Sequence, residues 1–365
     1  MKPIATYRKL RGGYYTPKPI ADFLVRWAIQ TPTARVLEPS CGDGVFLQAA
    51  AETLLEKGAT TTEISGLIYG VECDPQEAAK ALAHLHTICS HLPTTQVHVG
   101  DFFAYCHTNL TNRYYFDAIV GNPPFVRYQN FPEEQRRIAF YLMQRAGLHP
   151  NRLTNCWVPF LVSATLLLNE TGRLAMVIPA ELLQVNYAAE LRYFLSQYYA
   201  SITLITFKKL VFGDIQQEVV LLLGERARSE HSGIRTIELD GISDLASYEH
   251  AAFLDSDLKE MDHSTEKWTM YFLEAEDLQL LRMLRTHTGL TKASYVIDVD
   301  VGIVPGLNEF FVLSEQQVEQ LGLRPYTRRI VGRSAHLQGV LFSETDWVST
   351  VEKQVPIRIL GNNWS

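Results

Sequence analysis

Short apolar runs that favour strands alternate with helical patterns along residues 1–225, and this alternation constrains the fold more than any other feature of the chain. The runs are continuously hydrophobic, which is typical of parallel strands covered by helices on both faces. They span residues 34–39, 65–72, 95–100, 116–121, 173–179, 201–207 and 217–225. The pattern therefore predicts an α/β fold built on a doubly wound parallel sheet.

Helical patterns fill most of the gaps between these runs. They cover residues 44–57, 75–90, 132–146, 154–169 and 187–199. No helical pattern separates the last two strands, so we expect them to form an antiparallel hairpin at one edge of the sheet. Ligands of doubly wound sheets bind beyond the carboxyl ends of the strands, and functional residues are therefore expected just after each strand.

The chain has 365 residues, of which 47% are hydrophobic, enough for two domains. Residues 1–225 are expected to form the first domain and the polar, acidic segment 226–265 a linker. A helix at 270–286 and a β-rich region after it predict a smaller second domain at 266–365. No apolar run approaches the roughly 18 residues that span a bilayer, so we expect a cytoplasmic protein without a membrane partner.

Charge and cysteine content exclude two further classes of protein. A net charge of −7 argues against a protein that coats nucleic acid through charge alone. The cysteines stand at positions 41, 73, 89, 106 and 156, without a CxxC pair or the spacing of metal ligands. We predict reduced thiols, no disulfide and no metal site.

The first predicted strand leads into a turn with two glycines, Glu38-Pro39-Ser40-Cys41-Gly42-Asp43-Gly44, at the start of a helix. Glycines let the backbone approach a ligand closely, and the first turn of a helix offers N–H groups. The GxGxxG fingerprint of dinucleotide-binding proteins is absent, which disfavours a nicotinamide enzyme.

Acidic residues follow the second and third strands. Glu72 stands where a carboxylate could accept hydrogen bonds from ribose hydroxyls. Asp101 could accept from an exocyclic amine, and Phe102 or Phe103 could cover a purine ring. Together with the glycine turn, these residues predict a ligand that carries adenosine without a pyrophosphate, although Asp101 could instead cap a helix.

The fourth strand ends in Asn122-Pro123-Pro124-Phe125. Two prolines form a stiff turn whose carbonyl groups lack local partners, so the Asn122 side-chain oxygen and the Pro123 carbonyl can both accept from one NH₂ group. An aromatic amine is a poor nucleophile, and two fixed acceptors favour a pyramidal nitrogen with an available lone pair. Phe125 would stack on the base that carries the amine.

These motifs resemble those of the gamma class of adenine-N6 DNA methyltransferases, a restriction-modification family with a class I, Rossmann-like methyltransferase fold. The resemblance includes Gly13-Tyr14-Tyr15-Thr16-Pro17 and the helix after it, which precede the glycine turn as the donor segment does in that class. It implies a site-specific enzyme that uses S-adenosylmethionine to methylate a flipped adenine in double-stranded DNA. Phe125 stands where many members have tyrosine, which preserves the stacking.

The resemblance also assigns roles to individual residues. Those expected to bind S-adenosylmethionine are Tyr15, Thr16, Pro17, Glu38, Ser40 and Gly42 at the methionine end, Glu72 at the ribose, and Asp101 and Phe102 at the adenine. Those expected to act on the target base are Asn122, Pro123, Pro124 and Phe125. The family places a further aromatic ring near the sixth strand, for which Phe212 is the first candidate and Phe207 the second.

Residues 266–365 resemble the start of a target-recognition domain and are shorter than that domain in relatives, so we expect a fragment or one half of a split system. A separate endonuclease or specificity chain is an expected partner. Phosphate contacts are expected from basic residues, namely Arg127, Arg136, Arg137, Arg324, Arg328, Arg329 and Arg333.

Two other functions remain open from the sequence. The same motif serves methylation of adenine in RNA or of a glutamine side chain in protein, although the donor segment and the second domain favour DNA. Alternatively, the chain is a DNA-recognition subunit that binds the donor without turnover, against which the intact Asn122 argues.

Overall fold

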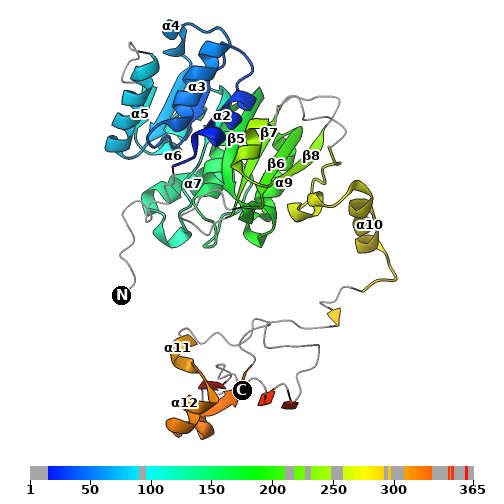
Figure 1. Ribbon diagram of the computed structural model, residues 1–365. Helices are drawn as coiled ribbons and strands as arrows, with labels where there is room; N and C mark the ends of the chain where they lie inside the picture. Colours follow the sequence, from blue (N-terminus) through cyan, green and yellow to red (C-terminus); the bar gives the residue numbers. More distant parts are fainter. Residues whose placement is uncertain are drawn as a thin grey trace. The chain divides into compact units, whose positions relative to one another are not determined.

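Figure 1 presents the chain as a computed structural model. The structure describes residues 15–89, 96–209, 218–226, 232–247, 258–291, 295–296, 308–330, 344–345, 347–348 and 358–360. The chain divides into two compact units, residues 1–285 and 286–365. Each unit has its own sheet.

An eight-stranded sheet forms the centre of the first unit, in the order β3-β2-β1-β4-β5-β7-β6-β8. Its strands are β1 (Val36–Glu38), β2 (Ile68–Glu72), β3 (Val97–Val99), β4 (Phe116–Gly121), β5 (Leu168–Pro179), β6 (Ser201–Phe207), β7 (Val219–Glu225) and β8 (Gly233–Leu239). The five neighbouring strands β3, β2, β1, β4 and β5 pair in parallel. The strand order reverses between β1 and β4. The predicted α/β class and parallel strands are confirmed.

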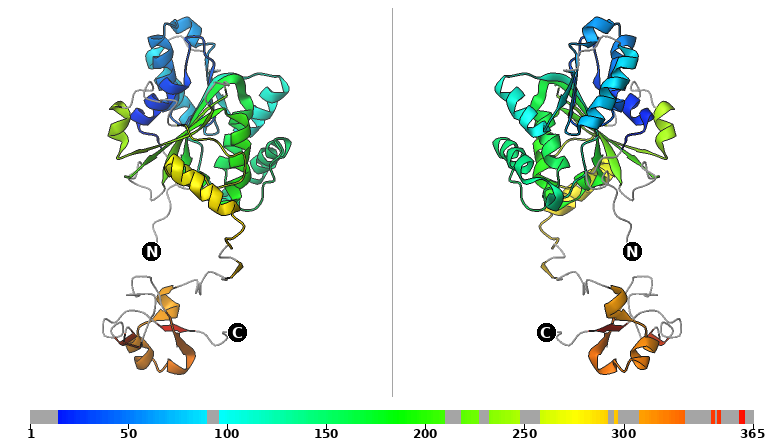
Figure 2. Two further views of the ribbon diagram at one scale, coloured as in Figure 1. Left: turned by 90° about the vertical axis from the view of Figure 1, so that its right-hand side faces the viewer. Right: turned by 90° about the vertical axis from the view of Figure 1, so that its left-hand side faces the viewer.

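Helices cover both faces of this sheet (Figures 1 and 2). The helices up to residue 286 are α2 (Lys18–Ala28), α3 (Val45–Glu56), α4 (Thr61–Ile64), α5 (Pro75–Ile88), α6 (Phe102–Thr111), α7 (Glu133–Arg145), α8 (Trp157–Leu167), α9 (Ala189–Tyr198) and α10 (Ala275–Thr286), of which α10 lies beyond the sheet. The predicted helices are present, with ends shifted by a few residues. Only the alternative role of Asp101 as a helix cap indicated α6 in the sequence, because its buried residues Phe102, Phe103 and Cys106 are too few to give a clear helical period.

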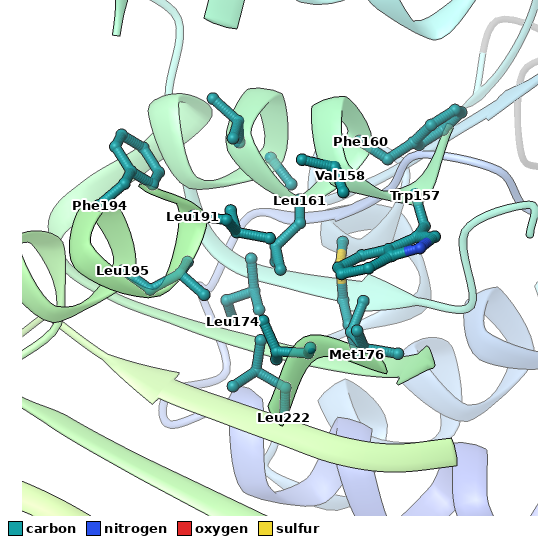
Figure 3. Close-up of a cluster of buried hydrophobic side chains, with 14 of the residues drawn as sticks. Trp157, Val158, Phe160, Leu161, Leu174, Met176, Leu191, Phe194, Leu195 and Leu222 are labelled. Atoms are coloured by element: carbon teal, nitrogen blue, oxygen red, sulfur yellow. The ribbon is translucent and has the colours of Figure 1, made fainter. Parts of the chain in front are cut away.

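The strands divide their side chains between two hydrophobic cores, one on each face of the sheet. Val36, Ala118 and Val120 lie in the core formed with α2, α3 and α5. Leu37 and Ile119 lie in the core formed with α6 to α9. Figure 3 shows part of the second core, where Trp157 and Leu161 of α8 and Leu191 of α9 face Leu174 and Met176 of β5. Burial on both faces explains why the strands are continuously apolar.

The strands beyond β5 differ from the prediction in one respect. The expected antiparallel pairing of the last two predicted strands is confirmed for β6 and β7. However, β7 lies between β5 and β6, and the edge is taken by β8, which pairs in parallel with β6. β8 lies within the segment expected to be a linker, 226–265, because its apolar residues Ile234, Ile237 and Leu239 do not alternate regularly with polar ones and so give no clear strand period.

The chain after β8 returns to pack on the first unit, so the observed boundary follows Arg285 and not residue 265. Trp268 and Tyr271 are fully buried in the core of the first unit. Arg192 of α9, 1% exposed, donates to the carbonyl oxygens of Glu266 at 2.7 Å and of Thr265 at 3.3 Å. These contacts attach residues 258–285 to the sheet that carries the site.

The second unit contains a three-stranded antiparallel sheet in the order β10-β11-β9. Its elements are α11 (Asn308–Phe311), β9 (Val312–Leu313), α12 (Glu315–Gln320), β10 (Thr327–Arg329) and β11 (Arg358–Leu360). Ser314 caps α12 in a capping box with Gln317. In the described part of the whole chain, no helix has both the length and the hydropathy required to cross a bilayer.

Candidate functional site

Hydrogen bonds join the segment before α2 to the ends of β1, β2 and β4. The Asn122 side-chain Nδ2 donates to Thr16 Oγ1 at 3.2 Å, and Ser40 Oγ donates to the Asn122 carbonyl oxygen at 3.4 Å. The Gly42 N–H donates to a Glu72 carboxylate oxygen at 2.9 Å. Residues predicted to bind the donor and residues predicted to act on the base therefore meet at the same edge of the sheet.

The turn after β1 has a backbone shape that requires glycine. Gly42 has a φ of +52° and Gly44 a φ of +89°, both in the left-handed region. A Cβ atom on Gly44 would lie 2.9 Å from the Cα and Cβ atoms of Ala81 in α5. The close approach of α5 and the positive φ angles together fix the position at which α3 begins.

Glu38 ends β1 as a buried carboxylate, 2% exposed. Its Oε2 atom is buried without a hydrogen-bond partner among the described residues. Burial raises the pKa of Glu38 well above its ordinary value, and the carboxylates of Glu72 and Asp43 raise it further. Because the charged form is disfavoured by both causes, a cationic group beside Glu38 would relieve an unfavourable arrangement.

Glu72 is oriented by backbone N–H groups at the end of β2. One carboxylate oxygen accepts from Gly42, and the other accepts from the Asp74 N–H at 2.8 Å. A carboxylate has about four lone-pair positions, so these two bonds fix its orientation and leave capacity for further donors. The sequence analysis predicted Glu72 as a ribose ligand, and this geometry is compatible with that role.

Asp101 and Phe102 lie where α6 begins after β3. Asp101 caps the helix by accepting from the Ala104 N–H at 2.9 Å, as the alternative interpretation of the sequence expected. Burial raises the pKa of Asp101, and the backbone N–H groups lower it in part. The Phe102 ring is 3% exposed and stacks on Phe160 at a centroid distance of 5.0 Å. Its predicted contact with a purine stays a prediction, since little of the ring is accessible here.

The predicted donor segment precedes α2, with Pro17 at the helix N-cap. Tyr15 is 46% exposed, and its hydroxyl donates to Glu77 in the first turn of α5 at 3.1 Å. Thr16 is 6% exposed and accepts from Asn122. The pair Thr16 and Asn122 connects the start of the chain to the end of β4.

The residues of the turn after β4 differ in how deeply they are buried. Pro123 is buried, whereas Asn122, Pro124 and Phe125 are half-buried. Phe125 contacts both hydrophobic cores, so its ring lies at the edge of the sheet, between them. Gly121 has a φ of +152°, and a Cβ atom there would lie 3.5 Å from Glu38 Cγ, so the turn passes directly beside Glu38.

The residues after Phe125 make contacts that the sequence analysis did not predict. The Tyr128 N–H donates to Asn155 Oδ1 at 3.3 Å, and the Cys156 N–H donates to the Val126 carbonyl oxygen at 2.8 Å. Asn155 Nδ2 donates to the Tyr187 hydroxyl at 3.2 Å. The only local signal in the sequence was an asparagine at the start of a predicted helix, 154–169, where asparagine is an ordinary capping residue.

The remaining predicted residues are the second aromatic ring and the basic residues expected to contact phosphates. Phe212 lies outside the described residues, and the second candidate, Phe207, is partly buried at the end of β6. Among the basic residues, Arg127 and Arg137 are exposed, and Arg136 lies 4.5 Å from the centroid of the Tyr128 ring. In the second unit, Arg324 pairs with Glu315 and Glu319 and Arg329 pairs with Glu344, while Arg333 also lies outside the described residues.

Comparison with known families gives two matches. Residues 2–288 match the N-6 DNA Methylase family, and residues 265–364 match the C-terminal domain of Type II methyltransferase M.Eco57I. The chain is 24% identical over 352 residues to Type II methyltransferase M.HindII of Haemophilus influenzae, covering 91% of the chain and 60% of that protein. It is 30% identical over 206 residues to M.TthHB8I of Thermus thermophilus, covering 54% of the chain and 41% of that protein.

Solved structures share the fold at low sequence identity. The DrdV–DNA complex superposes with a TM-score of 0.60 at 15% identity, over 87% of this chain and 38% of that one. The DNA-bound enzyme LlaBIII superposes with a TM-score of 0.58 at 12% identity, over 96% of this chain and 28% of that one. The chain spans about three fifths of the length of the first curated relatives, between 56% and 61%.

The family match covers most of the chain, and it contains the glycine turn, both acids and the turn after β4. The resemblance to gamma-class adenine-N6 DNA methyltransferases is confirmed by this match and by the similarity to type II methyltransferases. This chain belongs to the N-6 DNA Methylase family.

Proposed function

We propose that the chain transfers a methyl group from S-adenosylmethionine to the N6 amine of an adenine in DNA, after the base has been flipped into the site. The observation that carries this proposal is the 3.2 Å hydrogen bond from Asn122 to Thr16. It brings the residue expected to receive the amine against the segment expected to hold the methyl donor. The reaction requires these two groups to be neighbours.

The residues at the ends of β1 and β2 fit the donor. The buried Glu38 oxygen, for which the described residues supply no partner, suits the ammonium group at the methionine end, beside Tyr15, Thr16, Pro17, Ser40 and Gly42. Glu72 suits the ribose hydroxyls, and Asp101 and Phe102 are proposed at the adenine. When bound, S-adenosylmethionine supplies a methyl carbon made electrophilic by its sulfonium centre.

The turn after β4 would prepare the amine for attack. Since Nδ2 of Asn122 donates to Thr16, Oδ1 is the atom of that amide directed to accept hydrogen bonds. Together with the Pro123 carbonyl oxygen it would accept both N6 protons, which keeps the nitrogen lone pair out of the purine ring. As the N6 lone pair attacks, the bond between the methyl carbon and sulfur would break and S-adenosylhomocysteine would leave, while one N6 proton would pass to water. Pro124 stiffens the turn, and Phe125, with Phe212 as a second ring, would hold the base by stacking.

Double-stranded DNA is the proposed partner. The DrdV and LlaBIII structures are described as DNA complexes, and the match of residues 265–364 is to the C-terminal domain of a type II methyltransferase. We propose that the region 266–365 contributes to recognition of a DNA sequence in a restriction-modification system. A separate endonuclease or specificity chain and a cytoplasmic location belong to the same proposal.

Labelled S-adenosylmethionine tests the proposal directly. The chain is incubated with duplex DNA that lacks N6-methyladenine, with RNA and with a glutamine-containing protein substrate, alone and with the product of the neighbouring reading frame. We expect label in DNA adenine, identified as N6-methyladenine by mass spectrometry of the nucleosides. Label only in RNA or in glutamine would mean that this molecule, and not DNA, is the substrate. No label in any sample would contradict the proposal that the chain is an enzyme.

A further inference from the structure

The segment that leaves Phe125 is held by two consecutive residues from a different part of the chain. Asn155 accepts from the Tyr128 N–H, and Cys156 donates to the Val126 carbonyl oxygen. These bonds fix the backbone on both sides of Arg127, directly after the residue expected to stack on the target base. None of them involves the glycine turn, Glu38 or Glu72.

Asn155 is in turn held by a series of hydrogen bonds in which each side chain donates to the next. Its Nδ2 donates to the Tyr187 hydroxyl at 3.2 Å, and that hydroxyl donates to the carboxylate of Glu181. Glu181 can only accept and a backbone N–H can only donate, so the two ends determine every bond between them. The Tyr187 hydroxyl has one proton, which it gives to Glu181, and Asn155 must therefore present its NH₂ to Tyr187 and its oxygen to Tyr128.

The loop that carries Glu181 and Tyr187 is itself fixed. These residues lie in two 3-10 turns after β5, η3 (Ala180–Leu183) and η4 (Asn186–Ala188). The buried guanidinium of Arg192 donates to the carbonyl oxygens of Leu182 and Val185, each at 3.0 Å. Burial lowers the pKa of Arg192 to about 10, so the group stays charged at neutral pH. The charged donor connects η3 and η4 to α9.

We propose that Asn155, oriented by Tyr187 and Glu181, is a positioning residue for the target base. It acts through the backbone of residues 126–128 and sets where Phe125 stands beside Asn122. The inference rests on the proposed function, because positioning matters only if a base enters this site. Substituting Asn155 should disturb the base without disturbing the donor, since its side chain bonds to Tyr128 and Tyr187, neither of which is proposed to bind the donor.

The test compares Asn155→Ala, Tyr187→Phe and a remote control, Asn169→Ala. Asn169 also makes side-chain hydrogen bonds, to Asp117 and to the Thr171 N–H, but it lies at the opposite end of β5. Because a displacement of about 1 Å can cost about 100-fold in rate, we expect Asn155→Ala to lower kcat for DNA methylation by about 10- to 100-fold. The Kd for S-adenosylmethionine should stay within about twofold of the wild-type value, and Asn169→Ala should lower Tm without this selective loss.

Exchanging the amide of Asn155 and the carboxylate of Glu181 tests the direction of the hydrogen bonds between them. Asn155→Asp alone leaves the single proton of Tyr187 between two carboxylates and should lose as much activity as Asn155→Ala. Adding Glu181→Gln supplies a donor at the far end, so that Tyr187 can accept from the new amide and donate to the new carboxylate. We expect the double variant to recover to within about threefold of the wild-type kcat, a rescue that a general loss of packing would not allow.

Hydrogen exchange of the free protein supplies a readout that needs no activity. Asn155→Ala should speed exchange in peptides covering residues 126–130 and leave those covering 38–44 unchanged. Unchanged kcat, a parallel loss of donor binding, or no rescue in the double variant would overturn the positioning role while the methyltransferase proposal stands. A wild-type chain that methylates no adenine in DNA would overturn both, even with faster exchange in the variant.

Discussion

Glu72 accepts from two backbone N–H groups, whereas Asn122 bonds to the side-chain hydroxyls of Thr16 and Ser40, and other side chains position the backbone that follows it. The proposed donor side of the site comprises residues 15–17, which lead into α2, and the strand ends and the turn at Glu38–Gly44 and Glu72. The acceptor side, residues 122–128 with Asn155, depends on polar contacts from the loops before α8 and after β5. The two sides meet at the Asn122–Thr16 bond.

This difference indicates how the two substrates are treated. The proposed donor would meet Glu72, which backbone N–H groups orient, and the buried Glu38, which lacks a partner for one oxygen among the described residues. The proposed target base would enter from a duplex, and the surface that would receive it includes the half-buried Phe125. Substitutions should therefore separate donor binding from methyl transfer, and the size of each effect should show which side was disturbed.

The largest expected effect is on the acceptor side. Asn122→Ala removes one of the two oxygens proposed to receive the amine, and loss of such a preorganised group typically costs 100- to 1,000-fold in rate. We expect single-turnover methylation to fall by about 1,000-fold while calorimetry gives a donor Kd within about threefold of the wild-type value. Parallel loss of transfer and of donor binding would mean that Asn122 supports the structure of both sides.

The matching change on the donor side is Glu38→Gln. A hydrogen bond to a charged group contributes about 1.5–3 kcal/mol, so donor binding should weaken by about 10- to 100-fold. A saturating concentration of donor should restore most of the transfer rate of Glu38→Gln. It should not restore the rate of Asn122→Ala. A Glu38→Gln protein that binds the donor as tightly as the wild type would remove Glu38 from the donor site.

A smaller effect is expected where the two sides meet. Thr16→Val keeps the shape of the side chain but removes the acceptor for Asn122 Nδ2, a change of about 1 kcal/mol or about fivefold in rate. Thr165→Val is the matched control, because Thr165 is also buried and hydrogen-bonded, to the Leu161 carbonyl oxygen and Tyr199. The control should lower Tm without changing transfer, and equal rates for Thr16→Val and wild type would show that the bond does not orient Asn122.

The smallest effect is on the pH dependence of stability without donor. The pKa of Glu38 is raised above its ordinary value of 4.5 in the folded state, so the folded protein holds this proton more tightly than the unfolded chain. Its contribution to the free energy of unfolding is fully present below the ordinary pKa and is lost as pH rises through the raised one. In thermal melts from pH 5 to 8, the Tm of Glu38→Gln should therefore rise relative to that of the wild type as the pH increases. A Tm difference that does not change with pH would contradict the raised pKa.

The sequence predicted the parts of the molecule that follow local rules. Continuous apolar runs located the strands from β1 to β7, and the turns after β1, β2 and β4 contain the residues that the structure brings together. These motifs could be found because each lies directly after a strand, where the topology of a doubly wound sheet gathers ligands.

The sequence did not predict what depends on contacts between distant segments. β8 lies in a polar segment and becomes a strand through its pairing with β6, and residues 258–285 join the first unit through Trp268, Tyr271 and the bonds of Arg192. Asn155, Tyr187 and Glu181 are ordinary polar residues in three separate turns, and only the folded chain brings them together. Burial of the Phe102 ring against Phe160 has the same origin, since it depends on how α6 meets α8.

The most direct test of the central claim is the position of the target amine in a complex of the chain with a donor analogue and a duplex that it methylates. We expect a flipped adenine whose N6 lies about 3 Å from both Asn122 Oδ1 and the Pro123 carbonyl oxygen, with its ring against Phe125. An adenine that remains stacked in the duplex, or an N6 that contacts neither oxygen, would contradict it.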